Sequence, residues 1–144
     1  MKWFSKKNKQ DQFTDPKDMS PLEAVTHLCA SIQIVDGQSD NEERLVWINT
    51  ISNLFPEFID ERAEKFMKQA LIVLGRKNQD QKLEYTKDIL NRIKVLLDRE
   101  KIELLCLKIA ELIEADGMVM TSEIAIADII KNELGINIII SDDL

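Results

Sequence analysis

The chain contains an internal repeat, and this repeat restricts the possible folds more than any other feature of the sequence. The segment Ile32–Gly37 aligns with Leu112–Gly117 at an offset of 80 residues, and Glu43 then aligns with Glu123. Each copy consists of an apolar helical stretch, Asp-Gly, five further residues, Glu and a second helical stretch. Because residue type and spacing match together, the pattern predicts a duplicated helix–Asp-Gly–helix hairpin whose copies pack about an approximate two-fold axis.

Start and stop signals divide the chain into helices. Ser20, Pro21 and Glu23 form a helix start, because serine can cap the backbone three residues on and proline suits the first helical position. Gly135 follows the last helical stretch as a C-terminal cap. Apolar residues recur at helical spacing between these points. We therefore expect six helices, at about residues 21–36, 40–55, 60–74, 81–97, 102–115 and 121–134.

Length and composition agree with a single folded domain. The chain has 144 residues, of which 44% are hydrophobic and 31% charged, so it is neither disordered nor too short for a core. Four glycines and three prolines are too few for a sandwich of many tight turns. We expect an all-α fold, a compact helical bundle over residues 20–144, preceded by a flexible basic and polar tail over residues 1–19. The short apolar run Ile136–Ile140 is expected to pack onto the bundle.

The charge distribution restricts the partners. A net charge of −7 makes general nucleic-acid binding a poor expectation. The start of the chain differs, because residues 1–9 combine four lysines with Trp3 and Phe4. This composition is typical of a weak peripheral contact with anionic lipid, but a flexible solubilising tail is the favoured explanation. With two distant cysteines and no secretory signal, a cytoplasmic location is expected, with or without membrane association.

The repeat places four acidic residues at matching positions: Asp36, Glu43, Asp116 and Glu123. If the two hairpins pack about a two-fold axis, these carboxylates can gather near it, and their oxygens suit Ca²⁺, Mg²⁺ or Mn²⁺. An EF-hand loop is excluded, because its first and third ligand positions are apolar in the first copy. The alternative is that the glutamates cap helix starts and the aspartates accept hydrogen bonds from the following turn.

The repeated motif also resembles a known family. The sequence Ala/Val-Asp-Gly-x5-Glu, beginning at Val35 and Ala115, is similar to that of TerB-like domains of the tellurite-resistance type, and to the N-terminal region of DjlA-type co-chaperones. The resemblance covers about Pro21 to Ile136. It implies a compact helical domain with a pseudo-symmetric pair of hairpins, an acidic cation site near the Asp-Gly turns, and a role in stress resistance without an established enzymatic reaction.

The resemblance carries over to this chain residue by residue. The positions that match are Asp36, Glu43, Asp116 and Glu123, and the possible extra ligands are Asp40, Glu42 and Glu114. The leading hypothesis is therefore a non-enzymatic protein that binds a divalent cation in a stress-response or scaffolding role. The runner-up is a protein–protein interaction module, similar to the co-chaperone domain, in which the acids only cap helices. A metal-dependent hydrolase is a third class, but no histidine or lysine can be assigned as its base.

Three other side chains are candidates for chemistry: His27, Cys29 and Cys106. His27 is the single histidine, and without a nearby nucleophile it is expected to be a partly exposed helix residue. Cys29 and Cys106 lie on apolar helix faces and are expected to pack in the core. The sequence therefore predicts no catalytic residue and an unknown protein partner.

Overall fold

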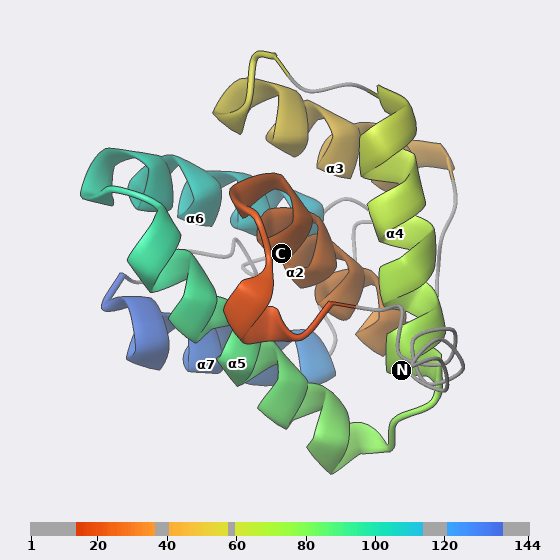
Figure 1. The fold of residues 1–144 in the computed structure, drawn as a ribbon. Helices are drawn as coiled ribbons and strands as arrows, with labels where there is room; N and C mark the ends of the chain where they lie inside the picture. Colours follow the sequence, from red (N-terminus) through yellow and green to blue (C-terminus); the bar gives the residue numbers. More distant parts are fainter. Residues whose placement is uncertain (1–13, 37–40, 58–59, 114–120, 137–144) are drawn as a thin grey trace, which may run out of the picture.

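The computed structural model describes the backbone of residues 14–36, 41–57, 60–113 and 121–136 (Figure 1). Within these ranges it describes every side chain except those of residues 33–36, 41–46, 60, 112–113 and 121–123. The elements are one 3₁₀ helix and six α-helices: η1 (Pro16–Asp18), α2 (Pro21–Asp36), α3 (Asn41–Leu54), α4 (Asp60–Gly75), α5 (Gln79–Leu96), α6 (Arg99–Ile113) and α7 (Thr121–Leu134). The described residues contain no strand, and the expected all-α bundle of about six helices is confirmed.

Helix α2 is the centre of the bundle. It packs against α4 and α5 most extensively and also touches α3, α6 and α7. Every residue from Glu23 to Ile32 is buried, including the polar ones, so this helix has no solvent-facing side over that stretch. A helix surrounded in this way buries its polar residues together with its apolar stripe.

The internal repeat is visible in the helix bounds. Helices α3 and α7 both contain fourteen residues, and both ends of α7 lie 80 positions after those of α3. Helix α3, from the first copy, packs against α6 of the second copy, and α7 of the second copy packs against α2 of the first. The second helix of each copy thus packs against the first helix of the other.

The helix ends follow the local signals. The backbone N–H of Glu23 donates to Oγ of Ser20 at 3.2 Å, which confirms the serine cap of α2. Gly135 has φ +73°, and its N–H donates to the carbonyl of Lys131 at 2.8 Å to close α7. Helix α5 begins two residues earlier than the expected Gln81, because that glutamine is the third helical residue of a capping box.

That capping box is reciprocal. The N–H of Gln81 donates to the Asn78 side chain at 2.8 Å, and the N–H of Asn78 donates to the Gln81 side chain at 2.9 Å. Two backbone donors at the start of α5 are therefore satisfied by side chains. The start of the helix is set by Asn78, one position before its first residue.

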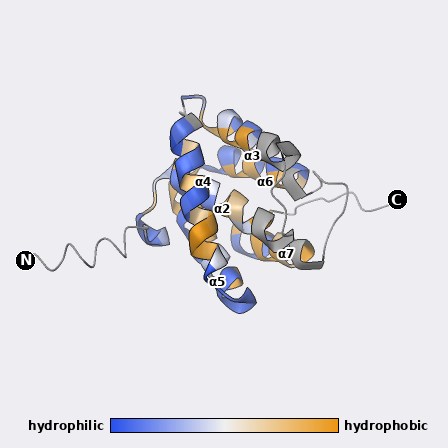
Figure 2. Cartoon of the chain, turned by 90° about the vertical axis from the view of Figure 1, so that its right-hand side faces the viewer, coloured by the Kyte–Doolittle hydropathy of each residue, from blue (hydrophilic) through white to orange (hydrophobic). Residues whose placement is uncertain are grey.

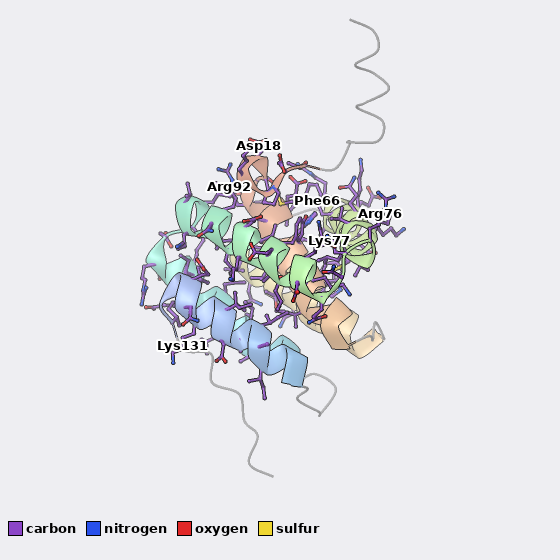
Figure 3. The ribbon with its side chains drawn as sticks, turned by 90° about the horizontal axis from the view of Figure 1, so that it is seen from below. Asp18, Phe66, Arg76, Lys77, Arg92 and Lys131 are labelled. Atoms are coloured by element: carbon purple, nitrogen blue, oxygen red, sulfur yellow. The ribbon has the colours of Figure 1, made fainter. Side chains whose placement is uncertain are left out.

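The packed part of the chain begins before the expected boundary at Ser20. Residues Pro16–Asp18 form η1, which lies against α5, and Met19 is fully buried in the core. The guanidinium Nε of Arg92 on α5 donates to the carbonyl of Met19 at 2.9 Å. Figure 3 shows Asp18 and Arg92 together on this side of the molecule. Residues 1–13, which include the lysines and aromatic residues of the expected membrane contact, lie outside the described part.

The core is continuous from α2 to α7. Fully buried side chains come from all six α-helices, together with Met19, and include Leu28, Ile51, Leu74, Leu90, Ile109 and Ile130. Figure 2 shows the hydrophilic residues of α4 and α5 interrupted by the hydrophobic ones that form this core. Ile136 packs against the core after α7, and the rest of the run to Ile140 lies outside the described residues.

Candidate functional site

Two of the four predicted metal ligands, Glu43 and Glu123, lie at equivalent points of α3 and α7. Asp36 is the last residue of α2, Glu43 is the third residue of α3, and Glu123 is the third residue of α7. Asp116 lies in the connection between α6 and α7, outside the described residues. The side chains of the other three also lie outside the described part, as do those of the additional candidates Asp40, Glu42 and Glu114.

Among the described side chains, no group of three or more His, Cys, Asp or Glu residues lies close enough together to hold a metal ion. The carboxylates of the Asp-Gly turns are not among these side chains. The acidic turns of the repeat therefore stay the metal-binding candidates that the sequence predicted.

A buried polar pair joins the central helix to α5. The Tyr85 hydroxyl lies 2.8 Å from Nδ1 of His27, and both side chains are at least nine-tenths buried. In the neutral ring, the hydroxyl either donates to a bare Nδ1 or accepts from a protonated one. The other ring nitrogen, Nε2, is buried without a hydrogen-bond partner among the described atoms. Buried polar atoms without partners are rare and costly, so this nitrogen destabilises the fold.

Burial also keeps both His27 and Tyr85 in their uncharged protonation states at neutral pH. Desolvation lowers the pKa of His27 from 6.5 to about 4, because the imidazolium would be charged in an apolar interior. Burial raises the pKa of Tyr85 far above its ordinary value, with smaller contributions from the nearby carboxylates of Glu23, Asp15 and Asp88. The ammonium of Lys77 lies 5.1 Å from the centre of the Tyr85 ring. At neutral pH the pair is therefore two uncharged groups that share one hydrogen bond.

The expectation that His27 is partly exposed was wrong. Its side chain is 1% exposed, because Tyr85 of α5 lies against it and the surrounding stretch of α2 is buried on every side. The sequence does contain a signal of this burial. Between Pro21 and Asp36, Glu23 is the single residue with a full charge at neutral pH, and such a weakly charged helix is typical of one surrounded by others.

Both cysteines are buried, which confirms their expected place in the core. Burial raises the pKa of Cys29 to about 12 and that of Cys106 to about 11. A thiol with such a pKa is protonated at neutral pH and is a poor nucleophile. Neither cysteine therefore supplies an activated thiolate.

A cleft of about 880 Å³ lies on the outer side of Tyr85. Its walls come from the segment around η1, the end of α4 and the first half of α5. Charged groups of both signs line the cleft. The acidic ones are Asp15, Asp18 and Asp88, and the basic ones are Arg76 and Lys77. Figure 3 shows Arg76 and Lys77 near the start of α5. Such a mixed surface favours no single class of ligand.

Comparison of the chain with protein-family models, with curated proteins and with solved structures finds no match. The resemblance to TerB-like domains therefore remains a prediction from the repeated motif. No helix in the described part of the chain is both long enough and apolar enough to cross a bilayer.

Proposed function

We propose that this chain is a non-enzymatic, TerB-like helical protein that binds a divalent cation through its two Asp-Gly-x5-Glu turns. The ligands are carboxylate oxygens of Asp36, Glu43, Asp116 and Glu123, and Ca²⁺, Mg²⁺ and Mn²⁺ are the cations that such oxygens prefer. The role that this resemblance suggests is in stress response or scaffolding.

The observation that supports the proposal is the agreement between the sequence repeat and the helix bounds. Because α3 and α7 begin 80 residues apart, Glu43 and Glu123 occupy the same position in the first turn of equivalent helices. The packing of α3 on α6 and of α7 on α2 brings helices of the two copies together in one bundle. Two equivalent turns with the same acids are a suitable basis for a shared or duplicated cation site.

Thermal unfolding with and without cations tests the proposal. A cation that binds only the folded state, at 100 times its Kd, stabilises it by about 2.7 kcal/mol, which raises the Tm of a domain of this size by several degrees. We expect such a rise with one of Ca²⁺, Mg²⁺ or Mn²⁺ relative to EDTA. The double variant Glu43→Gln with Glu123→Gln should abolish the rise.

The matched control is Glu61→Gln with Glu100→Gln. These glutamates also lie in the first turns of helices, α4 and α6, so their loss changes helix-dipole stabilisation and net charge in the same way. The control should keep the cation response. If no cation shifts the Tm, or if both double variants lose the shift equally, the acids act as helix caps and the cation proposal is wrong.

A further inference from the structure

We draw no further inference here: the strongest candidate, the groove that the starts of α2, α4 and α6 form with the ends of α3 and α5, carries none, because its two cations, Arg62 and Lys101, are balanced by two acids, Glu57 and Asp98, and nothing in the structure shows what covers its apolar floor.

Discussion

Acidification should destabilise this protein through His27. In the fold the pKa of this imidazole is about 4, against an ordinary value of 6.5 that it regains on unfolding. Between these two values the unfolded chain binds more protons than the folded one, so stability falls as the pH falls from about 6.5 towards 4. With each pKa unit worth about 1.4 kcal/mol, the loss is about 2 kcal/mol at pH 5 relative to pH 7.

Urea unfolding at pH 7 and pH 5 measures this loss. Carboxylates also titrate in this range, so the His27 contribution is isolated by comparing the chain with the variant His27→Gln. The amide can replace the hydrogen bond to Tyr85 but carries no proton to titrate. The variant should lose about 2 kcal/mol less than the unmodified chain between the two pH values.

A direct titration checks the same reasoning. His27 is the single histidine of the chain, so its imidazole signals in an NMR titration need no assignment against others. They should remain those of a neutral ring down to about pH 4, unless the chain unfolds first. A folded-state titration near 6.5, or an equal pH dependence in the variant, would refute the argument that burial keeps this ring neutral.

Two further outcomes follow from the buried groups. Tyr85→Phe should destabilise the fold by about 1–3 kcal/mol, because it leaves Nδ1 of His27 without its partner in a ring whose Nε2 already lacks one; equal unfolding midpoints in urea would contradict this. Cys29 and Cys106 should resist a thiol-reactive dye in the native state and react fully in denaturant, since both are buried with raised pKa values. Rapid labelling of either thiol without unfolding would be inconsistent with this placement.

Much of the fold could be predicted from the sequence because its signals are local. Ser20 caps α2 and Gly135 closes α7 through hydrogen bonds that span three or four residues. Such contacts form wherever the flanking residues are helical, whatever the remainder of the chain does. Helix α5 begins two residues before the expected Gln81, because Asn78 caps the helix and Gln81 is its third residue.

The candidate functional residues also differ in whether local sequence signals predict them. The repeat that contains Asp36, Glu43, Asp116 and Glu123 was found from the sequence, and the equal bounds of α3 and α7 agree with it. The groove at Arg62 and Lys101 could not be found in this way. Its residues come from helix ends that are far apart in the chain, and no periodicity or spacing connects them.

By itself, the sequence determined the helices, their approximate ends and the duplication, because each depends on hydrogen bonds and apolar spacing within a few turns. Which helix is surrounded depends on the tertiary structure. Five other helices pack on α2, so the His27 side chain is excluded from solvent and forms a hydrogen bond with Tyr85, 58 positions away in the chain. Burial of a polar side chain depends on what packs over it, and helix packing against α2 is a property of the whole chain rather than of the segment around His27.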